Sequence, residues 1–186
     1  MPEYDVIVIV IGAGRAGLAA GHAIRTTDLS FRLLEAGGPW PRFYDSLNLF
    51  LPAKYCALPG LPFPATRGGT PHRDEAAAIP RQCTNHFALP VRTGSRVATV
   101  RRHAGGLVVE LAGSEQLTAR AVIAATGPFG APQVPAPAGV KSYNGELLHT
   151  AAYRRLGAAM GVRDDDRWQR CHDCHPCLRR PCSDPR

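Results

Sequence analysis

The feature that most constrains the fold is a glycine-rich turn directly after a run of aliphatic residues near the start of the chain. The run extends from Asp5 to Ile11 without polar alternation, which is typical of a parallel strand covered on both faces. The turn follows as GAGRAG at residues 12–17, and residues 18–25 are rich in Ala and Leu, as in a helix packed closely on a sheet. With a second strand expected at residues 31–34, this stretch predicts one βαβ unit.

The three glycines of this turn fit the binding of a diphosphate. Gly12 permits a sharp exit from the strand, Gly14 lets the backbone approach a phosphate, and Gly17 lets the helix pack closely on the strand. The N–H groups that begin the helix would then face the anion. Glu35 ends the second strand, where a carboxylate accepts hydrogen bonds from ribose hydroxyls. This acid disfavours a 2′-phosphate, so FAD or NAD fits better than NADP; a turn without a ligand is the alternative.

The next segment predicts an excursion followed by a helix. Residues 37–69 are dense in Gly, Pro and aromatic residues, which is typical of an ordered loop suited to cover a ligand. A helix is expected to begin at Thr70 and Pro71, with Thr70 as its cap and Pro71 in its first turn. Pro80 lies inside this helix, and the sequence offers no compensating reason for it. Apolar residues recur every four positions and mark its expected buried stripe: Ile79, Cys83 and Phe87.

The second half of the chain predicts strands. Residues 97–100 and 107–111 are strand-like and separated by a hairpin signal, residues 117–119 add a third short strand, and residues 121–125 predict a final buried strand. The expected fold class is α/β: a three-layer Rossmann-like dinucleotide-binding domain with a parallel sheet and a small antiparallel β-meander.

Composition narrows the classes of partner. The chain is 45% apolar, which favours a globular domain over disorder. Its formal net charge is +7, but the basic residues form no stripe and aromatic residues do not alternate with them, so nucleic acid is not an expected partner. No apolar segment is long enough to cross a membrane and no export signal is evident. We expect a cytoplasmic protein that binds small molecules, and the sequence leaves its oligomeric state open.

Four further motifs carry a resemblance to a known family. They are GPWPRFYDSL at residues 38–47, LPGLPFP at 58–64, ATGPF at 125–129, and YNGELLHTAAY at 143–153. The last matches the signature F-x-G-x-x-x-H-x-x-x-Y except for Tyr in the first position. Together with the glycine turn, and in the same order along the chain, they resemble flavin-containing monooxygenases and related class B flavoproteins over residues 4 to about 155.

The resemblance implies FAD as the cofactor, NADPH as a co-substrate and a small organic molecule as a possible substrate. It places Trp40 on the flavin side, Val97 at the adenine, and Thr126–Gly127 over the cofactor. Trp40 could instead be a core aromatic residue, and Thr126–Gly127 only the end of a strand. His149 belongs to a signature that links the FAD and NADPH regions, so no catalytic residue is assigned. The residues implied to bind the cofactor are Gly12, Ala13, Gly14, Arg15, Ala16, Gly17, Glu35, Trp40, Val97, Thr126 and Gly127.

The sequence departs from the family after Tyr153. NADPH binding would need a second glycine fingerprint there, and GAAMG at residues 157–161 lacks a preceding aliphatic strand and the right spacing. We expect an FAD-binding domain at residues 1–153, with the NADPH domain missing, and an irregular tail at 154–186. The leading function is a truncated FAD-dependent oxidoreductase of the monooxygenase-like class, whose turnover is left open. The alternative is a non-catalytic remnant that binds FAD or ADP.

The tail contains a cluster of cysteines with CxxC spacing and neighbouring histidines: Cys171, Cys174, Cys177 and Cys182. Thiolates and imidazoles bind zinc when four of them converge tetrahedrally. We favour the interpretation that this Arg-, Cys-, His- and Pro-rich segment is a GC-rich gene read in a shifted frame. Zinc binding, which would make the tail an interaction module, and redox use are the alternatives, and no residue is assigned as a metal ligand.

Overall fold

The computed structural model describes residues 4–64, 69–103, 105–130, 132–136, 138–144 and 149–155. All of these except Arg155 belong to one compact unit, residues 1–154, which we describe by itself. The expectations for the cysteine-rich tail fall on residues outside this described part. None of the described helices is long and apolar enough to span a membrane.

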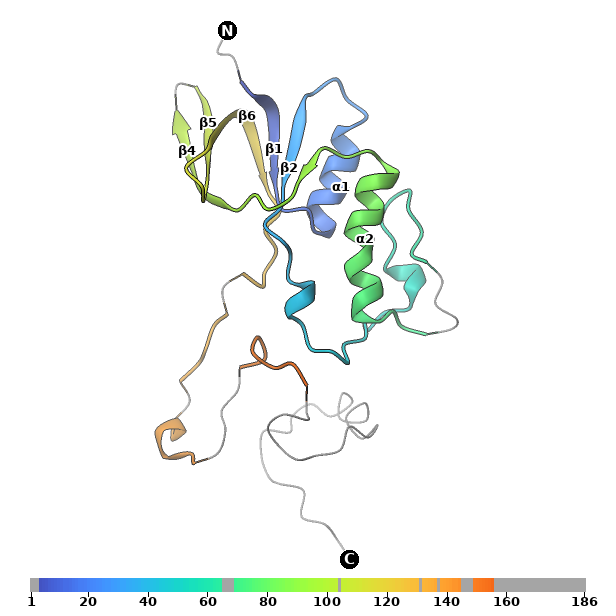
Figure 1. Ribbon diagram of the computed structural model, residues 1–186, viewed down its shortest axis with the longest axis vertical. Coiled ribbons are helices and arrows are strands. Elements are labelled where there is room, and N and C mark those ends of the chain that lie inside the picture. The colour runs from blue at the N-terminus through green and yellow to red at the C-terminus, as the bar shows by residue number, and fades with distance from the viewer. Residues whose placement is uncertain are drawn as a thin grey trace, which may run out of the picture. The chain divides into compact units, whose positions relative to one another are not determined.

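The predicted βαβ unit is present at the N-terminus (Figure 1). It consists of β1 (Val6–Ile11), α1 (Arg15–Ile24) and β2 (Phe31–Leu34). The two strands are parallel, with Ile11 opposite Leu34, so both end at the same edge of the sheet. This edge places the glycine turn after β1 beside the residue that follows β2.

The sheet has six strands in the order β3-β2-β1-β6-β5-β4. The remaining strands are β3 (Val91–Arg92), β4 (Val97–His103), β5 (Gly106–Leu111) and β6 (Gln116–Ala124). β3, β2, β1 and β6 pair in parallel, whereas β6, β5 and β4 form an antiparallel meander. The α/β fold with a small meander is therefore confirmed, and β3, which has two residues, is too short to have been predicted.

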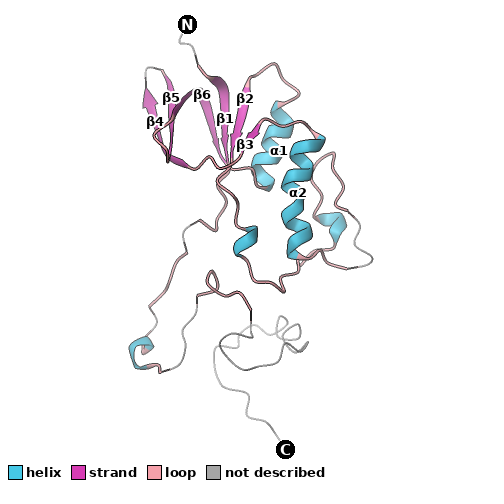
Figure 2. Cartoon of the chain, in the orientation of Figure 1, coloured by secondary structure: helices cyan, strands magenta, loops and turns pink. Residues whose placement is uncertain are grey.

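The core lies on both faces of the parallel strands. Figure 2 shows α1 and α2 (Arg73–His86) on the same side of the sheet. Fully buried Val10 packs there in a cluster with Leu18 and Ile79 from the two helices. On the opposite face, Ile9 packs in a second cluster with Val109 of the meander. The meander thus covers the face of the parallel strands opposite to the helices. The three layers are the helices, the parallel strands and the meander.

The predicted start of α2 is wrong by two residues. Its N-cap is His72, whose imidazole accepts an N–H from the first turn and whose own N–H donates to Glu75 Oε2 at 2.8 Å. Thr70 and Pro71 do not begin the helix, because the Pro71 carbonyl accepts the N–H of Leu49 at 2.8 Å and is held in an extended strand-like contact. A histidine is not among the residues preferred as N-caps, so the sequence pattern pointed to the threonine instead.

The remainder of α2 agrees with the sequence in part. Ile79 and Cys83 are buried, but Phe87 is only half-buried and follows the end of the helix as its C-cap. Burial raises the pKa of the Cys83 thiol. Pro80 lies inside the helix as predicted. The helix continues through Pro80, so the missing N–H leaves the carbonyl four residues earlier without its usual donor.

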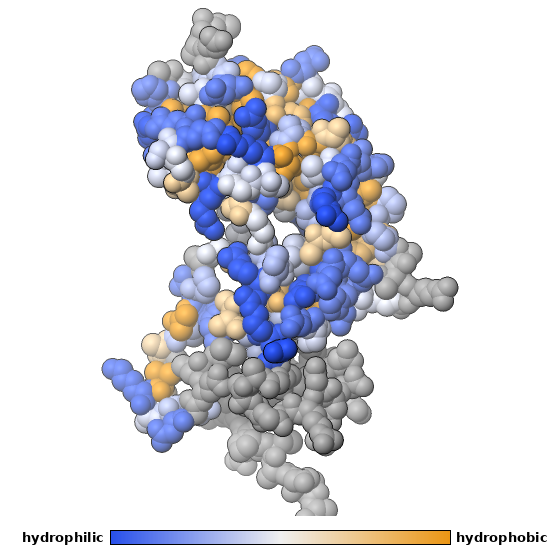
Figure 3. Space-filling view, viewed as in Figure 1, coloured by the Kyte–Doolittle hydropathy of each residue, from blue (hydrophilic) through white to orange (hydrophobic). Residues whose placement is uncertain are grey.

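The prediction of two separate strands at residues 117–119 and 121–125 is wrong. They form one strand, β6, because its first half pairs with β5 while its second half pairs with β1, and Ala119 pairs with both. The second half is also not buried: Ala121, Ile123 and Ala124 are exposed. Within the described residues, no helix covers this part of the sheet. Figure 3 shows hydrophobic residues that reach the viewed surface over the strands, among a majority of hydrophilic ones.

Candidate cofactor-binding site

Two glycines of the turn are required by the polypeptide itself. Gly12 has φ +102°, and a Cβ there would lie 2.4 Å from the carbonyl oxygen of Ala125. A Cβ at Gly17 would lie 1.9 Å from the carbonyl oxygen of Gly12. Only glycine lets α1 and the end of β6 approach β1 this closely.

Gly14 is different, because nothing in the described protein requires a glycine there. Its backbone has φ −75° and ψ −171°, which any residue can adopt. A Cβ at this position would meet no atom within 4 Å. The residue is exposed and forms the N-cap of α1. The space beside Gly14 is therefore open for a ligand to approach the backbone.

The N-terminus of α1 has the properties of an anion site. No side chain caps it, and its first turn contains no acidic residue. The first N–H groups of a helix have no partner within the helix and carry a partial positive charge. Together with the open space at Gly14, this end of α1 fits a diphosphate.

Glu35 lies at the predicted place and holds the turn together. Its Oε2 accepts the N–H of Ala13 at 2.6 Å, and its Oε1 accepts the N–H groups of Gly37 and Gly38 at 2.7 and 2.8 Å. A carboxylate offers about four acceptor positions, so about one is left for a further donor. The sequence pattern did not point to these two contacts with Glu35, although the positive φ angles of Gly37 and Gly38, +123° and +61°, explain why both residues are glycine.

A hollow of about 280 Å³ lies beside Glu35. The backbone N–H of Ser95 donates to the Glu35 carbonyl oxygen at 2.9 Å, which brings the segment before β4 to this edge. Val97, the predicted adenine contact, begins β4 directly after Arg96. The residues that line the hollow are Ala36, Gly37, Gly38, Pro41, Arg42 and Arg96.

The segment after β6 also reaches the turn. The Cα of Thr126 lies 3.5 Å from the position of a Cβ at Gly12, and Gly127 follows with φ +72°. Phe129 then packs its ring against Phe43 with 5.7 Å between centroids. The structure thus brings Thr126 beside the glycine turn.

Trp40 begins a short 3-10 helix (Trp40–Arg42) that follows Glu35. Its indole is half-buried and packs edge-on against Phe43 at 5.5 Å between centroids. The ring of Tyr44 lies 5.6 Å from that of Tyr153, at the end of the predicted signature. The loop after Glu35 therefore contacts the chain that follows β6 at two places, Phe129 and Tyr153.

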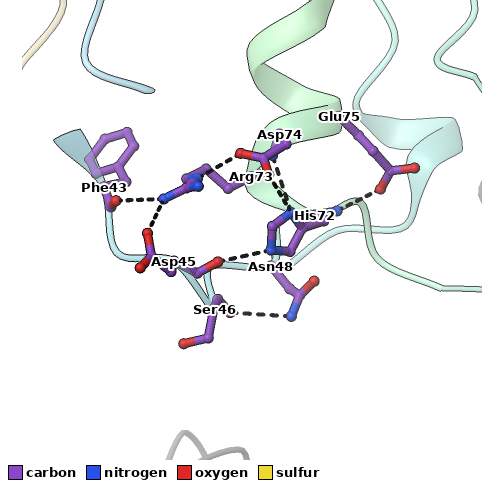
Figure 4. Close-up of polar contacts among 8 residues, drawn as sticks. All are labelled: Phe43, Asp45, Ser46, Asn48, His72, Arg73, Asp74 and Glu75. Carbon is purple, nitrogen blue, oxygen red and sulfur yellow. Dashed lines mark hydrogen bonds and ion pairs between the residues drawn. The ribbon is translucent and has the colours of Figure 1, made fainter. Parts of the chain in front are cut away.

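A polar network fixes the same loop to the start of α2 (Figure 4). Arg73 donates from Nη1 to the Phe43 carbonyl oxygen at 3.0 Å and to Asp45 Oδ1 at 2.8 Å. The His72 Nε2 hydrogen-bonds the Asp45 carbonyl oxygen at 2.9 Å. Arg73 also donates from Nε to Asp74 and holds the pKa of that carboxyl below its usual range. No sequence pattern pointed to this contact between residues about 28 positions apart.

Arg15 contacts the protein in a way that its motif did not reveal. Its guanidinium donates from Nη1 to the Cys56 carbonyl oxygen at 2.7 Å and from Nη2 to the Ala57 carbonyl oxygen at 3.2 Å. The side chain therefore extends from the glycine turn to the excursion between β2 and α2. His149, the histidine of the signature, hydrogen-bonds backbone atoms with both ring nitrogens. Its Nε2 contacts the Gln133 carbonyl oxygen at 3.1 Å, and its Nδ1 accepts the N–H of Ala151 at 3.1 Å.

Comparison with known proteins identifies the family. Residues 9–156 match the family model described as pyridine nucleotide-disulphide oxidoreductase. The chain belongs to this family. Within it, the chain is 33% identical over 155 residues to an uncharacterized oxidoreductase, CzcO, of Bacillus subtilis, which covers 81% of this chain and 44% of the relative.

Solved structures similar to this chain agree with the fold and the resemblance. A flavin-containing monooxygenase from Stenotrophomonas maltophilia is 40% identical, with a TM-score of 0.76 over 80% of this chain and 46% of that one. The enzyme OTEMO, solved in complex with FAD and NADP, is 25% identical with a TM-score of 0.63 over 87% of this chain and 32% of that one. The resemblance to flavoprotein monooxygenases is thus confirmed. The chain spans less than half the length of these relatives.

Proposed function

We propose that this chain binds FAD through the ADP half of the cofactor and forms the FAD-binding part of a flavoprotein oxidoreductase of the monooxygenase type. The observation that carries this proposal is the contrast among the three glycines. The protein itself crowds Gly12 and Gly17, whereas Gly14 faces open space beside an uncapped helix N-terminus. The OTEMO complex, which contains FAD and NADP, supports the choice of cofactor.

The residues of the turn have distinct tasks in this proposal. The N–H groups of residues 15–17 bind the diphosphate. Glu35 accepts a ribose hydroxyl with its remaining acceptor position, and the adenine lies in the hollow lined in part by Arg42 and Arg96. Both guanidinium groups are suited to stack on an aromatic base. FAD supplies electron transfer when bound, and the chain supplies its position and orientation.

The first experiment measures the cofactor directly. We expect the purified full chain to carry flavin that is released as FAD on denaturation, or to take up FAD when the flavin-free protein is titrated. Under anaerobic conditions dithionite should bleach the bound flavin. NADPH should bleach it slowly or not at all, because residues 154–186 contain no second glycine fingerprint. Rapid bleaching by NADPH would show that the chain is a reductase by itself.

Glu35→Gln tests the ribose contact. The variant keeps the size of the side chain but loses the charge, so we expect FAD to bind about 10-fold more weakly, since a hydrogen bond to a charged group contributes about 1.5–3 kcal/mol. The wild-type chain should also prefer ADP to ADP that carries a 2′-phosphate, because the Glu35 carboxylate repels that phosphate. The two affinities should differ less in the variant, which lacks this repulsion.

Glu110→Gln is the matched control, since Glu110 lies on β5 and contacts Thr99 across the meander. Titration calorimetry with FAD, with ADP and with ADP that carries a 2′-phosphate measures both the affinity for FAD and the nucleotide preference. An unchanged nucleotide preference in Glu35→Gln would remove Glu35 from the ribose site.

A further inference from the structure

A second cavity lies on the helix side of the sheet, between α1, α2 and the excursion at residues 49–63. Its volume is about 360 Å³, which is in the range of small-molecule sites. Its walls are mainly apolar and include Leu18 of α1, Phe63 of the excursion and Ile79 of α2. These three residues are buried, so the cavity enters the core cluster under the helices. An apolar ring system would fill such a space by replacing water that the walls cannot hydrogen-bond.

The mouth of the cavity carries large apolar side chains in contact with solvent. Phe50, Leu51 and Tyr55 all line the cavity and are 83%, 54% and 60% exposed. Exposed apolar residues that occur singly need no explanation, but a group around one opening marks a binding site. Their grouping favours a ligand whose apolar surface extends to this mouth.

Arg15 supplies the positive charge of this cavity. Its bonds to two carbonyl groups use two of the five N–H donors of a guanidinium and neutralise none of its charge. Among the described residues, the ion pairs that the structure contains do not include Arg15. A carboxylate or sulfonate at this end of the cavity would form charge-assisted hydrogen bonds with the donors that remain.

Pro80 lies in the part of the cavity wall that α2 forms. Because proline has no N–H, it cannot donate to the carbonyl of Ala76, one helical turn earlier. Ala76 and Pro80 both line the cavity. The Ala76 carbonyl therefore lacks its usual helical donor, in a part of α2 that lines the cavity.

We propose that this cavity binds a second small molecule, beside the FAD: an aromatic compound with an anionic group. Its ring lies among the apolar walls, and its anion lies on Arg15. The isoalloxazine ring of FAD fits the cavity less well, because its several carbonyl and ring nitrogen atoms outnumber the polar groups of the described walls, in which Arg15 is the one charged residue. The site shares Arg15 and Trp40 with the residues implied for FAD and is otherwise formed by residues without an assigned role.

Two fluorescent probes test the site on the full chain. Anilinonaphthalene sulfonate combines aromatic rings, an N–H donor and an anion, and phenylnaphthylamine is its neutral analogue. We expect one sulfonate probe per chain, bound by both the flavin-free and the FAD-loaded protein. Ala76→Leu, which fills the cavity from α2, should weaken both probes about 5-fold or more, whereas Ala78→Leu on the same helix should weaken neither. Arg15→Gln should weaken only the sulfonate probe, by about 10-fold, which is the loss of one charge-assisted bond.

Three results would overturn the proposal. Displacement of the sulfonate probe by FAD would assign the cavity to the cofactor. Equal effects of Ala76→Leu and Ala78→Leu would place the probe elsewhere. Equal weakening of both probes by Arg15→Gln would show that Arg15 acts on the shape of the loop and not on the anion.

Near-UV circular dichroism of each variant excludes a loosened core, which also binds such probes. A chain that takes up no FAD but binds the probes as described would leave this site standing and remove the proposed function.

Discussion

A valine at position 14 is expected to leave the chain folded and without flavin. The backbone of Gly14 is in an ordinary extended conformation, and a Cβ there meets no protein atom within 4 Å. The fold should therefore lose only the modest N-cap advantage of glycine, about 1 kcal/mol, which lowers Tm by about 2–4 °C. A diphosphate at the start of α1 would instead meet the valine methyl groups. We expect FAD affinity to fall by about 100-fold or more, which is about 2.7 kcal/mol.

The measurement for this variant combines the flavin content of the purified protein with its thermal unfolding. Gly69→Val is the matched control, because its Cβ also meets open space and the residue lies before α2, away from the turn. The control should retain flavin and melt like the wild type. Flavin retained at the wild-type level in Gly14→Val would contradict the position given to the cofactor.

Gly17→Ala is expected to have the opposite effect, a large loss of stability from a single methyl group. The new Cβ would lie 1.9 Å from the Gly12 carbonyl oxygen and 2.9 Å from its carbon. Both atoms belong to the backbone, so α1 would have to move away from β1 and lose part of the packing that covers this face of the sheet. Overpacking of this kind costs about 3 kcal/mol, and Tm should fall by about 6–12 °C.

Gly21→Ala tests whether this loss arises from the contact with Gly12. Gly21 lies one turn further along the same helix, and its Cβ would lie 3.2 Å from the two terminal methyl groups of Leu33 and 3.6 Å from Cε2 of Phe31. A flexible side chain gives way at little cost, and alanine gains about 1 kcal/mol of helix propensity over glycine. We expect Gly21→Ala to melt within a few degrees of the wild type. Similar melting of the two variants by calorimetry would show that the close approach at Gly17 does not limit the fold.

The sequence predicted the parts of the fold that depend on local chemistry. β1 could be predicted because its residues are aliphatic on both faces, and the turn because Gly12 and Gly17 are fixed by contacts within the βαβ unit and with the strand beside it. Glu35 could be identified because it directly follows β2. The same local reasoning misplaced the start of α2, since Thr70 and Pro71 have the usual pattern of a cap while His72 does not.

The contacts that sequence reasoning missed join residues far apart in the chain. Arg73 binds Asp45. Arg15 binds the carbonyl groups of Cys56 and Ala57, which lie 41 and 42 positions later in the chain. No periodicity or motif encodes such pairs, because they depend on how the excursion folds back over the helices. The division of β6 into two predicted strands has the same origin, since the partners of its two halves, β5 and β1, are decided by topology.

The central claim is that the ADP half of FAD binds at the start of α1, and titration of the flavin-free chain tests it most directly. We expect FAD to bind at one site per chain, ADP to compete with it, and riboflavin, which lacks the diphosphate and adenosine, to bind at least about 100-fold more weakly. Riboflavin that binds as tightly as FAD, or ADP that fails to compete, would contradict this account.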